Sequence, residues 1–355
     1  MERPQTVICP HPELEQRGRI AEDGTESFRI SLRDCLACSG CAITEDELEL
    51  LSRQNPTLVL EQLRQHPEFD AIVSTEVLAN VAAAKGVTLS EAFGGVKAYV
   101  ESLGGHLYNE AAFRLAYRKL VAQHFMESST RPLIISRCPG ANLFVERKTK
   151  LAHLLAPVKP VPQLFALVRK TFVLSIAPCF DRKLESGRFD GLVDATLTAS
   201  EIEQFVQPGE KTPMEFVGND DVEGVLQMLR PGESLVSQKK GNVTQYSAGD
   251  VIGAKITGEV AIRNFVRSVE TGKCEYAIVE LDLCPGGCVS GGGLIRGKTP
   301  AARRGLVRST ENLLAEAAST ALNEGELEEI LQVLKGEDIS ARYASVEKEE
   351  NPLDF

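Results

Sequence analysis

The stretch Tyr276-Ala277-Ile278-Val279-Glu280-Leu281-Asp282-Leu283-Cys284-Pro285-Gly286-Gly287-Cys288 joins a short, largely apolar run to a glycine-containing turn with two cysteines. A run of this length and composition is typical of a buried strand in a parallel sheet. Two further apolar runs, residues 132–136 and 171–176, end in Cys138-Pro139-Gly140 and Pro178-Cys179. Side chains at the carboxyl ends of parallel strands lie at one edge of an open α/β sheet. We therefore expect four cysteines to share one site: Cys138, Cys179, Cys284 and Cys288.

Four thiolates at one site are ligands for a soft metal. A single buried cysteine at a strand end is more often a small core residue. Here four cysteines lie in such turns, and three of them are next to a proline. This pattern favours one [4Fe–4S] cluster held by four thiolates. Cys274 lies outside the turns, and we interpret it as a core or surface thiol.

A second group of cysteines lies near the start of the chain, in Asp34-Cys35-Leu36-Ala37-Cys38-Ser39-Gly40-Cys41. The two-residue gaps turn the chain back on itself, so that Cys35, Cys38 and Cys41 can bind one iron–sulfur cluster. No further cysteine follows at ferredoxin spacing, and Cys9 is the only upstream residue that can supply the fourth thiolate. Spacing alone leaves a structural zinc site on the same four thiolates as the alternative.

The composition is that of a globular protein of a reducing compartment. The chain has 355 residues, of which 43% are hydrophobic and 25% charged, so it is long enough for two or three domains. Its net charge of −11 argues against a nucleic-acid partner. The first residues lack a secretory apolar core and no run reaches transmembrane length, so we expect no membrane association. The expected compartment is the cytosol or the nucleus, where nine cysteines serve as ligands or core residues rather than in disulfides.

Hydrophobic periodicity predicts an α/β fold beyond the first cysteine group. We expect short strands at 58–60 and 71–74, and helices at 75–85, 90–103 and 111–124. Residues 208–250 are rich in glycine and proline, and we interpret them as a surface excursion. The predicted division is an N-terminal iron–sulfur segment (1–56), a first α/β lobe (57–170), a second α/β lobe with C-terminal helices (171–340) and a flexible acidic tail (341–355).

The stretch Gly292-Gly293-Leu294-Ile295-Arg296-Gly297-Lys298-Thr299 matches the pattern of a nucleotide-binding phosphate loop. Such a loop leaves a strand directly, so that backbone N–H groups and the start of the next helix face the phosphate. Here the preceding strand is expected to end near Leu283, and a cysteine loop intervenes. We therefore expect no nucleotide site, and we interpret the glycines as positions where the backbone packs close to a cluster.

In order along the chain, these motifs resemble those of the iron-only-hydrogenase-like assembly factors of the cytosolic iron–sulfur pathway, also called nuclear prelamin A recognition factor-like proteins. Residues 31–41 resemble the N-terminal cluster motif, and the regions around residues 138, 179 and 284–288 resemble the three hydrogenase signatures. The resemblance implies an iron-only-hydrogenase-like α/β fold, with two lobes of mainly parallel sheets around a buried cluster. It also implies two [4Fe–4S] clusters, one on Cys9, Cys35, Cys38 and Cys41 and the other on Cys138, Cys179, Cys284 and Cys288.

The sequence departs from the hydrogenases at positions that serve hydrogen turnover. In the hydrogenases the cysteine that corresponds to Cys288 also bridges to a di-iron unit, and a cysteine directly before the first signature relays protons. This chain instead has Arg137 before Cys138, Arg182 in place of a lysine, and Ala177 and Asp282 where methionines tend to stand. The pocket has become harder and more charged, so we expect no catalysis. An iron-only hydrogenase or related oxidoreductase and a zinc-stabilised interaction module are the alternatives.

The last residues of the sequence, Leu353-Asp354-Phe355, resemble the terminal tripeptide with which clients and adaptors dock on the cytosolic targeting complex. An aromatic anchor beside a free carboxylate suits capture in a pocket with basic rims. The resemblance thus implies a non-enzymatic adaptor or carrier. It would receive clusters from a scaffold of P-loop NTPases and pass them, with the targeting complex, to cytosolic and nuclear apoproteins.

Overall fold

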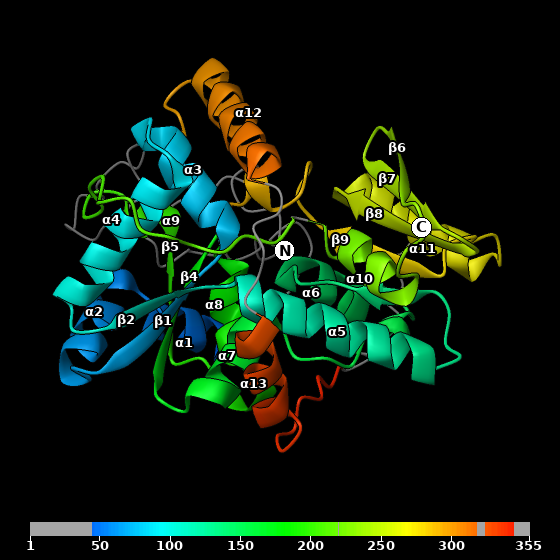
Figure 1. Cartoon of the computed structure of the whole chain (residues 1–355), viewed down its shortest axis with the longest axis horizontal. Coiled ribbons are helices and arrows are strands. Elements are labelled where there is room, and N and C mark those ends of the chain that lie inside the picture. The colour runs from blue at the N-terminus through cyan, green and yellow to red at the C-terminus, as the bar shows by residue number, and fades with distance from the viewer. Residues whose placement is uncertain (1–44, 219, 318–323, 344–355) are drawn as a thin grey trace, which may run out of the picture.

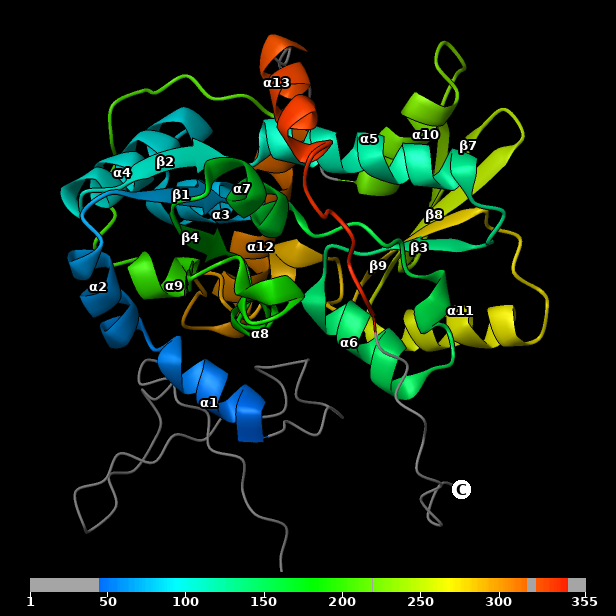
Figure 2. The ribbon, with the colours of Figure 1, turned by 90° about the horizontal axis from the view of Figure 1, so that it is seen from below.

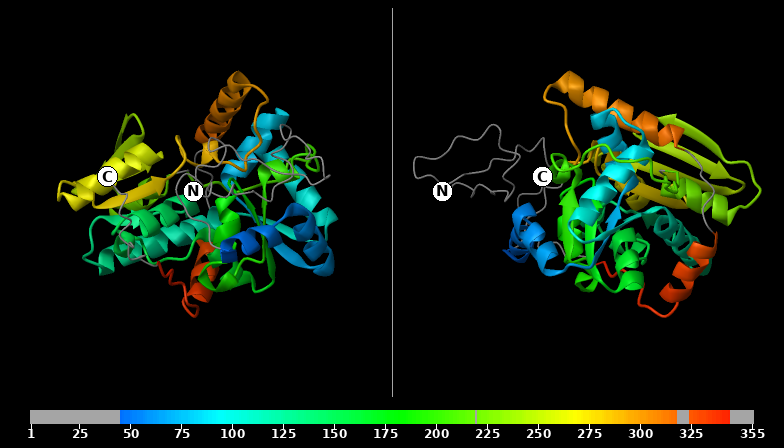
Figure 3. Two further views of the ribbon diagram at one scale, coloured as in Figure 1. Left: turned by 180° about the vertical axis from the view of Figure 1, so that it is seen from behind. Right: turned by 60° about the vertical axis from the view of Figure 1, so that its left-hand side comes forward.

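The computed structural model describes residues 45–218, 220–317 and 324–343. Within them, two sheets lie in opposite halves of the molecule, and helices cover both (Figures 1 and 3). None of the described helices is both long and apolar enough to span a membrane. Seven residues singled out in the sequence lie outside the described residues: Cys9, Cys35, Cys38, Cys41, Leu353, Asp354 and Phe355.

Sheet A consists of parallel strands in the order β2-β1-β4-β5. Their bounds are β1 (Phe69–Val73), β2 (His106–Asn109), β4 (Phe172–Ala177) and β5 (Ala195–Thr198). Every residue of β1 is buried, as expected of a parallel strand with helices on both faces. One face packs on α2 (Pro56–Gln65), α3 (Thr75–Lys85), α4 (Leu89–Ser102) and α9 (Ala199–Ile202). The other face packs on α5 (Ala111–Glu127) and α7 (Val161–Arg169).

Sheet B has the order β3-β9-β8-β7-β6 and is mixed. Its strands are β3 (Leu133–Ile135), β9 (Ile278–Asp282), β8 (Val251–Thr257), β7 (Val243–Ala248) and β6 (Val236–Lys240). The first three are parallel, whereas β7 and β6 form an antiparallel extension. One face shares a core with α5, α10 (Asp221–Leu229) and α13 (Glu324–Leu334). The other packs on α6 (Pro139–Lys148) and α11 (Glu259–Glu270). Because α5 contributes to the core under both sheets, it joins the two halves.

The remaining elements lie near the ends of the strands. They are the helices α1 (Glu45–Arg53), α8 (Asp181–Ser186) and α12 (Pro300–Glu316), and the 3-10 turns η3 (Ala152–Leu154), η4 (Phe189–Gly191) and η5 (Cys288–Ser290). Helix α1 packs on α8, where a Cβ added to Gly187 would lie 2.4 Å from a methyl group of Leu50. The segment that enters α1 is therefore attached next to the helix that follows Cys179.

After α13, residues 336–343 form a C-terminal strap that runs across the molecule toward α6 (Figure 2). Lys159, only 2% exposed, donates from its backbone N–H to the Ile339 carbonyl and from its ammonium to the Asp338 carbonyl, the latter over 2.6 Å. At the end of the strap, the Tyr343 ring packs edge-on against Phe189, with 5.7 Å between ring centroids. The strap thus reaches the segment that follows α8.

The predicted α/β class is confirmed, and so is the predicted helix 75–85, which ends at Gly86 with a left-handed φ of 68°. The predicted strand at 58–60 is wrong, because these residues lie inside α2. The helix begins where the Asn55 side chain accepts the Thr57 N–H at 2.9 Å and Pro56 occupies the first turn, where its missing N–H costs no hydrogen bond.

The interpretation of 208–250 as a surface excursion is also wrong, because this region supplies α10, β6 and β7. Some of its glycines and prolines lie in the irregular stretch 206–218 before α10, Gly224 lies inside α10, and the others stand in the turns around β6 and β7. The boundary between lobes at 170/171 stays a prediction. Each sheet takes strands from both sides of that point.

Candidate metal centre

Three strand ends carry the four described cysteines that were predicted to share a site. Cys138 follows β3 and stands at the N-terminus of α6, Cys179 lies between β4 and α8, and Cys284 and Cys288 follow β9. Strands β3 and β9 are neighbours in sheet B, so their ends are adjacent by register. The Ser136 hydroxyl links these two ends, since it donates to the Leu281 carbonyl at 2.9 Å and accepts the Cys138 N–H at 3.2 Å.

Glycines bring the third strand end, which belongs to sheet A, against the other two. The Gly293 N–H donates to the Pro178 carbonyl at 3.0 Å. A Cβ on Gly291 would lie 2.3 Å from that same oxygen, and one on Gly293 would lie 3.2 Å from the Cys179 Cα. Only glycine permits this approach. The loop after β9 therefore rests directly on the turn that carries Cys179, in agreement with the close packing expected from the glycine run.

Cys138 is buried, and Cys179, Cys284 and Cys288 are partly buried. This removal from water opposes the ionisation of the thiols. Burial raises the pKa of Cys138 to about 12, and the Asp282 carboxylate adds to the shift. The pKa values of Cys179, Cys284 and Cys288 lie well above the ordinary value, again mainly through burial, and the Cys138 sulfur contributes to all three. Thiolates in such a place need positive charge beside them, which a bound metal centre supplies.

The donor set is one that an iron–sulfur cluster uses. Four cysteine thiols stand at three adjoining strand ends, and thiolates are the usual ligands of such clusters. Among the described residues, no three Cys, His, Asp or Glu side chains are arranged to hold one metal ion.

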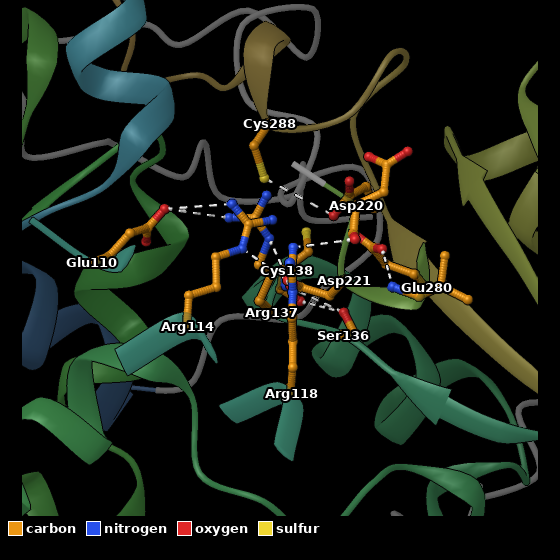
Figure 4. A network of polar contacts seen from close by, with 12 residues as sticks. Glu110, Arg114, Arg118, Ser136, Arg137, Cys138, Asp220, Asp221, Glu280 and Cys288 are labelled. Atoms are coloured by element: carbon orange, nitrogen blue, oxygen red, sulfur yellow. Dashed lines mark hydrogen bonds and ion pairs between the residues drawn. The ribbon is translucent and has the colours of Figure 1, made fainter. Parts of the chain in front are cut away.

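Arg137 lies beside Cys288 and is fixed by three carboxylates from different elements (Figure 4). Its guanidinium contacts Glu76 of α3 at 2.5 Å, Asp221 of α10 at 3.2 Å and Glu110 at 3.8 Å. Although burial opposes the charge, Glu76 and Asp221 raise the pKa of Arg137 well above its usual value. The arginine is therefore a permanent buried cation.

A second set of charges reaches Cys288 from the other side. The Lys255 ammonium on β8 lies 2.7 Å from Asp220, 3.2 Å from Glu280 and 3.3 Å from Asp282. The Cys288 thiol is in turn 3.9 Å from Asp282 Oδ1, to which it can donate. Cys288 therefore has both Arg137 and the Asp282 carboxylate as charged neighbours.

The cavity next to Cys288 is small, with a volume of about 20 Å³. That is room for roughly one water molecule. Glu76, Glu110, Arg137 and Arg182 line it together with Cys288. Arg182 also donates to the Arg137 carbonyl, which holds the two arginines together. Charged side chains therefore surround the small space beside this cysteine.

The partners of Arg137 were not recognised from the sequence. Glu76, Glu110 and Asp221 stand at or near helix starts, where acidic residues are common for reasons of the helix dipole alone. The sequence showed buried charges only in β9, where Glu280 and Asp282 interrupt an apolar run that should be buried.

The phosphate-loop pattern follows η5 rather than a strand. The Thr299 hydroxyl at its end caps α12 by accepting the Ala302 N–H.

This chain matches the family described as the iron only hydrogenase large subunit, C-terminal domain, over residues 68–247 and 211–292. The chain belongs to this family. The matched segments include Cys138, Cys179, Cys284 and Cys288. The family resemblance inferred from the motifs is confirmed.

Relatives within this hydrogenase-like family match over most of their length. A probable cytosolic Fe-S cluster assembly factor of Brugia malayi is 27% identical over 90% of this chain and 82% of its own. The cytosolic Fe-S cluster assembly factor NAR1 of Yarrowia lipolytica is 25% identical and covers 96% of this chain and 92% of its own. Protein NAR1 of Arabidopsis thaliana is 24% identical, with coverages of 87% and 80%.

Solved structures of hydrogenases share the fold. A single-residue variant of [FeFe]-hydrogenase HydA1 from Chlamydomonas reinhardtii superposes with a TM-score of 0.64 at 15% identity, covering 81% of this chain and 98% of the hydrogenase. An apo form of HydA1 gives a TM-score of 0.61 at 14% identity, with coverages of 78% and 94%. At this identity the likeness establishes the predicted hydrogenase-like fold and nothing about activity.

Proposed function

We propose that this protein is a cytosolic iron–sulfur cluster assembly factor that acts as an adaptor or carrier rather than as an enzyme. The observation that carries the proposal is the convergence of Cys138, Cys179, Cys284 and Cys288 in a hydrogenase fold whose adjoining cavity is filled by charged side chains. Relatives that cover most of the chain bear the name of assembly factors, which supports the same role.

In this proposal the chain holds two [4Fe–4S] clusters. The four thiols at the strand ends hold the buried one, and Cys9, Cys35, Cys38 and Cys41 hold the other. The clusters supply electron-accepting iron, and the surrounding chain keeps the buried one away from water. The terminal residues Leu353, Asp354 and Phe355 dock on the cytosolic targeting complex. Scaffold NTPases deliver the clusters to the chain. The chain acts in the cytosol and the nucleus.

Metal content separates this proposal from its rivals. We would purify the chain anaerobically, measure iron, zinc and sulfide, and compare wild type with Cys38→Ala and Cys288→Ala. We expect about eight iron and eight sulfide per chain, halved in each variant. Cys274→Ala is the matched control: this thiol donates weakly to the Tyr276 carbonyl at 3.9 Å, away from the strand ends, and iron content should not change. Zinc in place of iron would identify an interaction module instead.

The fold itself favours one second candidate, an iron-only hydrogenase. The same preparation tests it in a hydrogen-evolution assay with a strong reductant. We expect no sustained turnover, because Arg137 and its carboxylates occupy the cavity beside Cys288. Sustained hydrogen evolution would show that the protein is a hydrogenase and would overturn our proposal.

The assembly role is tested in cells that lack their own copy of the protein. Wild type should restore a cytosolic iron–sulfur enzyme, whereas Cys288→Ala should not. A mitochondrial iron–sulfur enzyme serves as the internal control, and its activity should be the same in cells that receive wild type and in cells that receive Cys288→Ala. Equal rescue by Cys288→Ala would show that the buried cluster is not needed for assembly.

A further inference from the structure

The Cys288 side of the proposed cluster faces two opposite charges that the chain holds fixed. Arg137 and Glu76 both line the cavity next to Cys288, and they are paired at 2.5 Å. Neither group is within reach of bulk water, since Arg137 is 5% and Glu76 is 1% exposed.

The surroundings hold this pair in one position. Asp221 contacts Arg137 at 3.2 Å and also accepts from Arg114 and Arg118 at 2.8 Å each. Glu110 lies 3.8 Å from Arg137 and accepts the Thr75 N–H at the start of α3, which fixes the backbone next to Glu76. A charge held this firmly acts on its neighbours without the reorganisation that solvent would need.

We propose that the Arg137–Glu76 pair sets the reduction potential of the buried cluster, with Arg137 raising it and Glu76 lowering it. The inference rests on the proposed function, because it requires a cluster on Cys138, Cys179, Cys284 and Cys288. It assigns both residues a tuning role, since they lie beside a ligand and do not bind the iron.

The physical argument concerns the added electron. Reduction places one more negative charge on the cluster and its thiolates, which a nearby cation stabilises and a nearby carboxylate destabilises. In a buried site these interactions are strong and salt screens them little. Both groups line the cavity next to Cys288, so the added charge develops close to them.

The test is a redox titration of the full-length holoprotein with dithionite as the electron donor, followed by electron paramagnetic resonance. A Cys38→Ala background leaves only the buried cluster to titrate. We expect Arg137→Gln to shift the potential to more negative values and Glu76→Gln to shift it to more positive values. Arg137→Lys keeps the charge and should stay closer to wild type than Arg137→Gln. Both shifts should persist at high salt.

Arg303→Gln is the matched control, because Arg303 is exposed at the start of α12 and contacts the Gly297 carbonyl. It should leave the potential unchanged. Shifts of the same sign in Arg137→Gln and Glu76→Gln, or no shift in either, would overturn the inference, since a merely structural role predicts no opposite signs. If Arg137→Gln does not fold, the direction of the shift in reduction potential of Glu76→Gln decides, and a shift to more negative values or no shift would overturn the inference. An iron-free wild type would instead refute the proposed function.

Discussion

Asp221 is the carboxylate on which buried arginines converge. Arg114 and Arg118 each contact its Oδ1 at 2.8 Å, and Arg137 contacts Oδ2 at 3.2 Å. These cations hold the pKa of Asp221 far below its usual value, although burial acts in the opposite direction. Removing the negative charge takes away the carboxylate that Arg118 contacts, and it leaves Arg114 and Arg137 with fewer carboxylates to offset their buried charges. We expect Asp221→Asn to lower the free energy of unfolding by about 3–5 kcal/mol, measured by urea unfolding of the anaerobic protein.

Asp250 offers the matched control for that substitution. It also pairs with an arginine, Arg230, at 2.6 Å, but its side chain is 81% exposed. Exposed pairs contribute roughly 0–1 kcal/mol because water and salt screen them. Asp250→Asn should therefore change stability little. Similar losses of unfolding free energy in Asp221→Asn and Asp250→Asn would show that burial does not determine how much these ion pairs stabilise the protein.

At the scale of single residues, the sequence predicted the thiols and a more charged pocket with Arg137, Arg182 and Asp282, but not the carboxylates that pair with Arg137. Cys138, Cys179 and Cys284 stand in turns directly after apolar runs, and that local pattern is visible in one chain. Arg137 follows β3, whereas Asp221 begins α10, with several strands and helices between them in the sequence. Their contact depends on how α10 packs on sheet B, which no local pattern reports.

At the scale of elements, the loop after β9 depends on a glycine. A Cβ on Gly293 would lie 2.6 Å from the Thr198 methyl, closer than real Cβ atoms come, and at a tight 3.2 Å from the Cys179 Cα. We expect Gly293→Ala to push this loop away from the turn after β4, lower the iron content and cost about 1–3 kcal/mol of stability. Iron analysis and urea unfolding of the same preparation measure both effects.

Gly305 provides the opposite case in the same region of the chain. It lies inside α12, is exposed, and a Cβ there meets no atom within 4 Å. Alanine favours the helix over glycine by about 0.5–1 kcal/mol. Gly305→Ala should therefore stabilise the protein slightly and leave its iron content unchanged. A loss of iron in this variant as well would mean that the α12 region, rather than the glycine contact, governs cluster binding.

Elements were predictable where a cap and a periodic run agreed. Ser74 caps α3 and Gly86 ends it, and both are visible in the sequence. Residues 58–60 were assigned to a strand because three apolar residues stand together, yet the Asn55-Pro56 pair before them is a helix start. The antiparallel strands β6–β8 could not be recognised in the sequence, because β6 is exposed along its whole length and shows no alternation of apolar and polar residues.

At the scale of the whole molecule, the segments on either side of the described core attach to one place. Leu50 of α1 packs against Gly187, and Tyr343 of the strap packs against Phe189, two residues further along. The same short segment begins with Cys179 and α8. The first described helix and the last described residues of the chain are therefore both attached to the segment that follows α8.

Two truncations separate the strap from the tail. A chain ending at residue 343 keeps every strap contact and lacks only Leu353, Asp354 and Phe355 with the residues before them. We expect it to match wild type in stability and iron content but to lose capture by the targeting complex in a pull-down. Retained capture would show that the terminal tripeptide is not the docking element.

A chain ending at residue 335 also removes the strap. The Lys159 ammonium then loses its bond to the Asp338 carbonyl and keeps only Asp190, 3.7 Å away, and Phe189 loses the Tyr343 ring. The loss of one charge-assisted bond at a buried cation, with the uncovered apolar contacts, should cost about 3 kcal/mol. Urea unfolding compared with the chain ending at 343 measures it. Equal stability of the two chains would mean that the strap adds nothing to the fold and only carries the tail to α6.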